Sequence, residues 1–153
     1  MVLFNLFRSP KRFFSKEDNH RIVHAIREAE SRTSGEVRVY VESRCRFVDP
    51  LERAAEIFFG LKMQNTDHRN GVLVYVALKD HQLAVFGDEG IHLKVGHEFW
   101  QEEVKKMISH FNRENYASGI STIVEDIGNA LKTHFPFERN DKNELPDEIV
   151  FGR

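Results

Sequence analysis

The chain has 153 residues, 41% of them hydrophobic and 30% charged, and its formal net charge is −2. This length and composition are typical of one globular domain and exclude an intrinsically disordered chain. The nearly balanced charge excludes a general attraction to nucleic acid. The single cysteine, Cys45, excludes an internal disulfide and a multi-cysteine zinc site.

The N-terminal segment, residues 1–14, reads MVLFNLFRSPKRFF and mixes apolar with basic residues. Its basic residues follow the apolar run and no small-residue cleavage site comes after them, so the order differs from that of a signal peptide. No stretch reaches the roughly 18 to 20 apolar residues of a membrane span. We therefore expect a cytoplasmic protein. The segment either makes a peripheral contact with a membrane or a partner, or packs on its own domain, through its phenylalanines Phe4, Phe7, Phe13 and Phe14.

The first half of the chain predicts a helix, a strand and a second helix. Ser15 and Asp18 have the spacing of a capping box, and apolar residues then recur at helical spacing until Ser34-Gly35 ends the helix. Residues 36–43 alternate between apolar and polar, as a strand with one more exposed face does. The next helix begins at Asp49-Pro50, where an acidic cap precedes a proline at the first helical position.

The second half predicts a hairpin followed by two helices. Residues 72–78 are a continuous apolar run, typical of a strand covered on both faces. A short polar turn separates them from a second strand, residues 82–87. Because this connection is too short for a crossover helix, the two strands form an antiparallel hairpin. The two helices lie around Trp100 and Ile123, and the sequence after them is polar.

The predicted order is therefore α-β-α-β-β-α-α. The first strand, its helix and the second strand form a right-handed parallel βαβ unit, so helices cover both faces of a small mixed sheet. The predicted fold class is α/β, a three-layer α/β/α sandwich. We expect one domain at residues 15–135, between the N-terminal segment and a polar tail, residues 136–153. The apolar residues of the tail either dock on a neighbour or fold back on the domain.

Several motifs of catalysis and nucleotide binding are missing from the sequence. It contains no G-x-G-x-x-G, no Walker motif and no G-x-S-x-G. Cys45 lies between two arginines, but nothing fixes a histidine beside it, which favours an incidental thiol. His20 and His24 have a spacing that can hold zinc, yet they lie off the apolar stripe of the first helix, which favours a solvated face.

The sequence Gly-Asp-Glu-Gly at residues 87–90 is the main candidate site. Glycine and aspartate are favoured in turns, so Asp88 and Glu89 are either solvated turn residues or ligands of a hard cation such as calcium or magnesium. In the predicted hairpin, the loop that contains Asp67 lies at the same end as this turn. The three acids therefore form a possible metal site, from which Cys45 is excluded because it lies at the opposite end.

Two parts of the sequence resemble the TPM domain family, which is named after a thylakoid lumen protein, a photosystem II repair protein and a nematode receptor modulator. The first is Arg-Asn-Gly-Val-Leu-Val-Tyr-Val-Ala from Arg69, and the second is the strand that ends in Gly-Asp-Glu-Gly-Ile. Ser-Gly-Glu-Val before the first strand and Phe-Trp after the glycine turn add to a likeness over roughly residues 15–135. Within the family, the sequence is similar to a small cytosolic bacterial branch.

The resemblance implies an α/β/α sandwich and, from some members, calcium or other divalent-ion binding. Plant members are linked to acid phosphatase activity, and bacterial members often lie genetically beside LemA-like membrane proteins. Asn70 and Gly71 match the family motif. Arg69 stands where many members have an aspartate, and residues 87–91 replace a common Gly-Tyr-Gly-Leu-Glu. The motif positions in this chain are thus Arg69, Asn70, Gly71, Gly87 and Gly90, and a family metal site does not carry over intact.

Two functional hypotheses follow. The first is a non-catalytic interaction module that binds a protein partner, such as a LemA-like membrane protein or another TPM-domain protein, with a divalent ion as a further ligand. The second is a divalent-metal-dependent phosphatase, in which Asp67, Asp88 or Glu89 holds a cation that activates water and Arg69 stabilises the phosphoryl group. We favour the first because the sequence offers the enzyme no identifiable nucleophile or general base.

Overall fold

A computed structural model describes residues 13–46, 49–111, 115–138 and 149–152. Within these residues the order of elements is α2, β1, α3, β2, β3, α4, α5, α6 and β4. The helices are α2 (Lys16–Glu30), α3 (Pro50–Gly60), α4 (Glu89–Val95), α5 (His97–Phe111) and α6 (Tyr116–His134). The strands are β1 (Glu36–Glu42), β2 (Gly71–Ala77), β3 (Gln82–Gly87) and β4 (Val150–Phe151).

The strands form one mixed sheet in the order β3-β2-β1-β4. The strands β1 and β2 are parallel, with Glu36 opposite Gly71, and α3 makes the crossover between them. The strands β2 and β3 form the antiparallel hairpin, with Val72 opposite Gly87. The predicted α/β fold and element order are confirmed, and the structure adds the short helix α4 and the edge strand β4.

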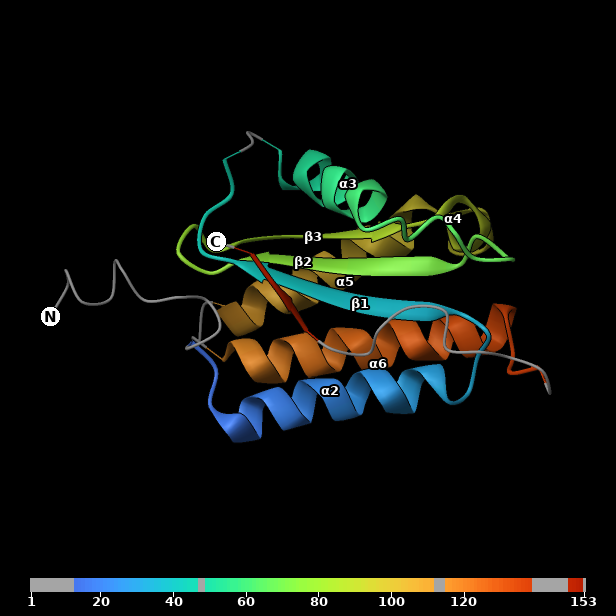
Figure 1. The fold of residues 1–153 in the computed structure, drawn as a ribbon, viewed down its shortest axis with the longest axis horizontal. Helices are drawn as coiled ribbons and strands as arrows, with labels where there is room; N and C mark the ends of the chain where they lie inside the picture. Colours follow the sequence, from blue (N-terminus) through green and yellow to red (C-terminus); the bar gives the residue numbers. More distant parts are fainter. Residues whose placement is uncertain (1–12, 47–48, 112–114, 139–148, 153) are drawn as a thin grey trace, which may run out of the picture.

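The sheet lies between two helical layers (Figure 1), with α3 on one face and α2 and α6 on the other. Alternation along the strands produces this arrangement, because successive side chains point to opposite faces. Val72, Val74 and Val76 of β2 pack in the larger cluster with α2 and α6. Leu73 and Tyr75 pack in the smaller cluster with α3. The continuous apolar run of β2 thus reflects burial on both faces.

The N-terminal segment meets the domain through its last two phenylalanines. Phe14 is only 6% exposed and packs in the larger cluster, which agrees with packing on its own domain. Phe13 is 43% exposed and lies edge-on against Tyr116, with ring centroids 5.2 Å apart. Phe4 and Phe7 lie outside the described residues.

The end of the tail folds back on the domain. Val150 pairs with Tyr40 in parallel register, and the amide of Gly152 donates to the carbonyl of Val41 at 2.8 Å. The ring of Phe151 lies 6.5 Å from that of Phe14, so the tail strand packs near the residue that precedes the first described helix. In the described parts of the chain, no helix has both the length and the apolar character needed to cross a membrane.

Candidate functional site at the acidic glycine turn

The hairpin brings the loop before β2 and the turn after β3 together. Because Val72 lies opposite Gly87, the residues just outside these positions are neighbours. The amide of Asp88 donates to the carbonyl of Gly71 at 2.9 Å, and the amide of Gly90 donates to the carbonyl of Arg69 at 2.8 Å. The predicted proximity of the two segments is therefore correct.

The two glycines of the turn are required by close approaches of other parts of the chain. A Cβ atom on Gly87 would lie 2.3 Å from the ring of Trp100. A Cβ atom on Gly90 would lie 2.1 Å from the carbonyl oxygen of His68 and 2.6 Å from that of Arg69. Neither distance is possible between real atoms. The glycines therefore let the indole and the loop backbone pack directly against the turn.

The two acids of the turn hold the guanidinium of Arg69. Nε of Arg69 donates to Oδ2 of Asp88 at 2.7 Å, Nη2 donates to Oδ1 at 2.8 Å, and Nη1 donates to Oε1 of Glu89 at 3.2 Å. This hydrogen bonding to Asp88, followed by the charges of both acids, raises the pKa of Arg69. Planar two-point contacts of this kind are the strong form of the arginine–carboxylate pair. We call this arrangement the Arg69 clamp.

Asp88 also begins the helix that follows it. The side chain is 2% exposed, and Oδ1 accepts from the amide of Glu89 at 2.8 Å, which makes Asp88 the N-cap of α4. Both carboxylate oxygens therefore accept hydrogen bonds from within the chain. Asp88 is a buried cap rather than a solvated turn residue, and the sequence pattern alone distinguishes these two roles poorly.

The remaining predicted residues have different surroundings. Asp67 is exposed in the loop before Arg69. Asn70 is 1% exposed, its amide group donates to Oγ of Ser34 at 3.3 Å, and its Oδ1 has no hydrogen-bond partner among the described residues. Gly71 begins β2, where a Cβ atom would approach the carbonyl oxygen of Met63 to 3.2 Å.

The turn as it stands does not fit a divalent cation. Such an ion needs several oxygen ligands, and both oxygens of Asp88 are engaged by Arg69. Within the described ranges, no group of three histidine, cysteine, aspartate or glutamate side chains is placed to hold a metal. An ion at this turn would first have to displace the guanidinium. Calcium or magnesium binding by Asp67, Asp88 and Glu89 stays a prediction.

A second buried acid, at the opposite end of β1, was not predicted. Glu42 accepts two hydrogen bonds from Arg53 of α3, at 2.9 and 3.0 Å, and a third from the hydroxyl of Tyr75. Burial first, and then hydrogen bonding to Glu42, raises the pKa of Tyr75. These contacts join α3 to the sheet. Glu42 looked like an ordinary polar residue of an alternating strand. Only the register of β1 with β2, which puts Glu42 opposite Ala77 and so two residues from Tyr75 on the same face, could have suggested otherwise.

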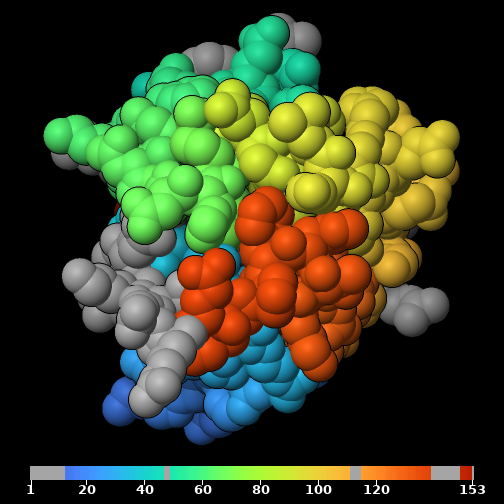
Figure 2. Space-filling model, turned by 90° about the vertical axis from the view of Figure 1, so that its right-hand side faces the viewer, coloured from blue at the N-terminus to red at the C-terminus, as the bar shows by residue number. Residues whose placement is uncertain are grey.

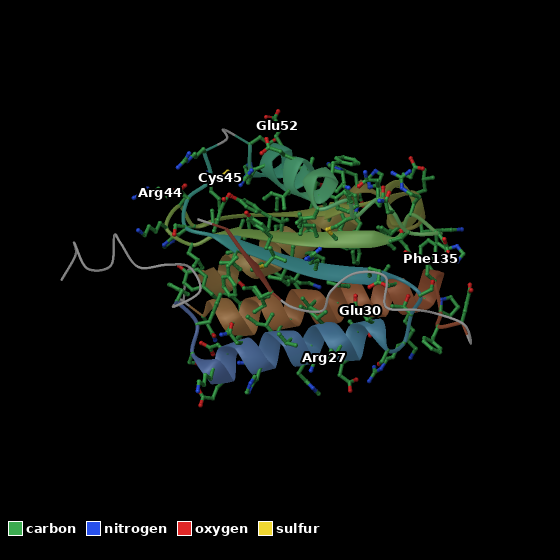
Figure 3. All side chains as sticks on the ribbon, in the orientation of Figure 1. Arg27, Glu30, Arg44, Cys45, Glu52 and Phe135 are labelled. Atoms are coloured by element: carbon green, nitrogen blue, oxygen red, sulfur yellow. The ribbon has the colours of Figure 1, made fainter. Side chains whose placement is uncertain are left out.

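The other candidates lie away from the turn. Cys45 is half-buried, and its amide donates to Oδ2 of Asp80 at 2.7 Å. Figure 3 shows Cys45 beside Arg44 at the end of the molecule opposite Phe135. His20 and His24 are exposed on α2, as the solvated-face interpretation expects.

Comparison with known families tests the resemblance that the motif from Arg69 suggested. Residues 8–130 match the family model of the TPM domain. The chain belongs to the TPM domain family. A search of curated proteins found no match.

Two solved structures resemble this TPM domain. The NMR structure of the BA42 protein from the psychrophilic bacterium Bizionia argentinensis is 39% identical in sequence, with a TM-score of 0.84. The match covers 92% of this chain and 96% of that one. The N-terminal domain of the cg2496 protein from Corynebacterium glutamicum is 14% identical, with a TM-score of 0.63 over 82% of this chain and 81% of that one. The second likeness concerns the fold alone.

Proposed function

We propose that this TPM domain is a non-catalytic interaction module. The observation that supports the proposal is the Arg69 clamp. The phosphatase hypothesis needs the acids of the turn to be available for an ion, whereas the guanidinium engages both oxygens of Asp88 and one oxygen of Glu89. A clamp of this kind stabilises a loop and leaves neither oxygen of Asp88 free to hold an ion.

The contact surface that we propose is the end of the molecule where Phe13 lies. Phe13 packs on Tyr116, whose hydroxyl lies 3.3 Å from Nε2 of His81 in the β2–β3 turn. The neighbouring Asp80 pairs with Arg44 at 3.1 Å. An exposed aromatic ring therefore lies beside polar and basic groups, and the sequence before it adds Arg8, Lys11 and Arg12. This combination suits a partner at a membrane surface.

The absence of catalysis is tested with a general phosphatase substrate. We expect no hydrolysis of para-nitrophenyl phosphate above background with calcium, magnesium or manganese. We also expect millimolar cation to leave the amide chemical shifts of residues 67–70 and 87–90 unchanged. Cation-dependent turnover that disappears in Asp88→Asn but persists in Glu102→Gln, an exposed acid on α5, would establish the phosphatase instead.

The contact surface is tested by flotation of the protein with vesicles of 30% anionic lipid, a composition chosen for the test. We expect the protein to float with the vesicles and this binding to weaken at high salt. We also expect Phe13→Ser and removal of residues 1–12 each to reduce it. Phe137→Ser is the matched control, because Phe137 is similarly exposed but lies away from Phe13. Its amide donates to the carbonyl of Arg32, which follows the C-terminal end of α2, whereas Phe13 precedes the N-terminal end. Equal loss in both variants, or no vesicle binding at all, would remove the membrane surface from the proposal.

A further inference from the structure

An open groove of about 450 Å³ lies where α4, α5 and the C-terminal half of α6 meet. Figure 2 shows the face on which α4 and the end of α6 lie against one another. The volume is within the range of roughly 300–1,000 Å³ that small-molecule sites occupy. The groove has an apolar part, formed by Val95, Phe99 and Ala130, and a charged part around Glu103.

Glu103 is the unusual member of this groove. It is only 3% exposed, although it is a glutamate on a surface helix. Oε1 accepts from Nζ of Lys106 at 3.2 Å, and the same ammonium donates to Oδ2 of Asp126 at 3.1 Å. Oε2 of Glu103 is buried and accepts no hydrogen bond in the described part of the chain. One ammonium therefore faces two carboxylates, and one carboxylate oxygen lacks a donor.

A buried carboxylate oxygen without a donor carries a large desolvation cost. Protonation of Glu103 reduces this cost. Burial, and next the hydrogen bond with Asp126, raise the pKa of Glu103 to about 7, while Lys106 acts in the opposite direction. A ligand that brings its own N–H donor and positive charge would take the place of that proton.

We propose that this groove binds an organic ammonium ion, whose N–H groups donate to Glu103 and Asp126 and whose apolar part lies against Phe99. Lys106 shows that an ammonium can contact both carboxylates at once, and it engages one oxygen of each, which leaves the other oxygens for the ligand. In the described residues no group of three histidine, cysteine or acidic side chains is placed to hold a metal, so the two carboxylates suit an organic cation better.

Charge within the groove limits the ligand further. Besides Glu103, Asp126 and Lys106, the titratable groups that line it are Lys94 of α4 and His134 of α6. The positive charge of Lys94 opposes a polycation. A ligand with one ammonium group and a neutral or anionic remainder is therefore the expected class.

The test uses n-butylammonium chloride as the probe and butan-1-ol as its uncharged counterpart, both titrated into the isotope-labelled full chain. We expect saturable amide shifts in α4, α5 and α6 with the ammonium alone. Glu103→Gln should weaken binding at least tenfold. Glu102→Gln, the neighbouring acid on the same helix with a side chain 64% exposed, should leave it unchanged. Asp126→Asn replaces Glu103→Gln if the latter does not give a folded spectrum.

Binding also depends on pH in a way that a general surface attraction does not reproduce. Below pH 7 the ligand must displace the proton of Glu103, so affinity rises by up to about tenfold per pH unit toward neutrality and then levels off. Equal binding of butan-1-ol, full binding by Glu103→Gln, or an affinity that is constant from pH 5 to pH 8 would each overturn the proposal. The proposal would also be overturned if magnesium ions, but not n-butylammonium, shifted the amide signals of α4, α5 and α6.

Discussion

Four acidic side chains are buried in the described residues, namely Glu36, Glu42, Asp88 and Glu103, and the partners of the last three decide what each does. Asp88 is held by Arg69 and by the first amide of α4, and Glu42 by Arg53 and Tyr75. Both acids therefore have donors on each oxygen, which is the condition for burying a charge at acceptable cost. Glu103 lacks this complete set. Of these three acids, the two fully paired ones are structural, and Glu103 is the candidate for ligand binding.

Gly90 should be among the least replaceable residues of the turn. A Cβ atom there meets backbone oxygens of His68 and Arg69, which move only if the loop before β2 moves. We expect Gly90→Ala to lower the free energy of unfolding by about 3 kcal/mol, measured by urea denaturation, because an overpacked site of this kind has to rearrange its backbone.

The matched control for Gly90 is Gly60, the last residue of α3, where a Cβ atom would meet nothing within 4 Å. Gly60→Ala should raise the free energy of unfolding by about 0.5–1 kcal/mol, since alanine restricts the unfolded chain and suits a helix. Equal effects at the two positions would show that the loop near Gly90 adjusts freely.

The protonation of Glu103 should make stability depend on pH. Its pKa is about 7 in the folded chain against an ordinary 4.5, so the folded state binds more protons between these values. The associated stability is fully present below pH 4.5 and is lost as pH rises through 7, by up to about 1.4 kcal/mol per pH unit. Glu103→Gln should therefore gain stability relative to wild type from pH 5 to pH 8 in urea unfolding. The free energy of unfolding of Glu102→Gln should change with pH in the same way as that of wild type.

Sequence patterns predicted the helices and strands that bury a periodic apolar face. They missed the two elements without such a face, α4 and β4. The helix α4 has seven residues, of which only Ile91 is buried, while Leu93 is 81% exposed, so it shows no apolar stripe. The strand β4 has two residues and exists only because β1 offers an edge to pair with. Local pattern is informative where an element stabilises itself on the core, and both of these elements depend on neighbours.

The candidate site was predictable to a similar extent. The hairpin register placed the loop of Asp67 and the turn of Asp88 at one end of the sheet, because strand direction alone determines this. The Arg69 clamp was not predicted, since it depends on which side chain of each segment points inward. Glu102 and Glu103 are adjacent and identical in type, and only the packing of α5 against α6 makes one exposed and the other buried.

The tail strand should contribute to stability although it is short. Ile149 and Phe151 pack against the larger cluster, and β4 covers part of the open edge of β1. Removal of residues 149–153 should lower the free energy of unfolding by about 1–3 kcal/mol and increase light scattering, because apolar area and a strand edge become exposed. Removal of Arg153 alone is the control and should change neither quantity.

At the scale of the whole molecule, the sheet is covered unequally on its two faces. The helix α6 has ten buried residues and packs with α2 and α5 over one face, whereas α3 has three buried residues and covers the other face alone. The contacts of Glu42 with Arg53 hold α3 on the sheet together with the smaller apolar cluster. The layer formed by α3 should therefore be the less stable one.

Native-state hydrogen exchange at low urea concentration should reveal this difference. We expect the amides of α3 to exchange through an opening with a lower free energy and a weaker urea dependence than those of α6, because α3 can detach while the larger cluster stays packed. Arg53→Lys removes the two-point pair with Glu42 and should lower the opening free energy of α3 without affecting α6. Arg21→Lys, which alters a single contact with Ser118 on the other layer, should leave α3 unchanged. If α3 and α6 exchanged with the same free energy and the same urea dependence, the two layers would open as one cooperative unit, and the single helix would be as firmly held as the larger layer.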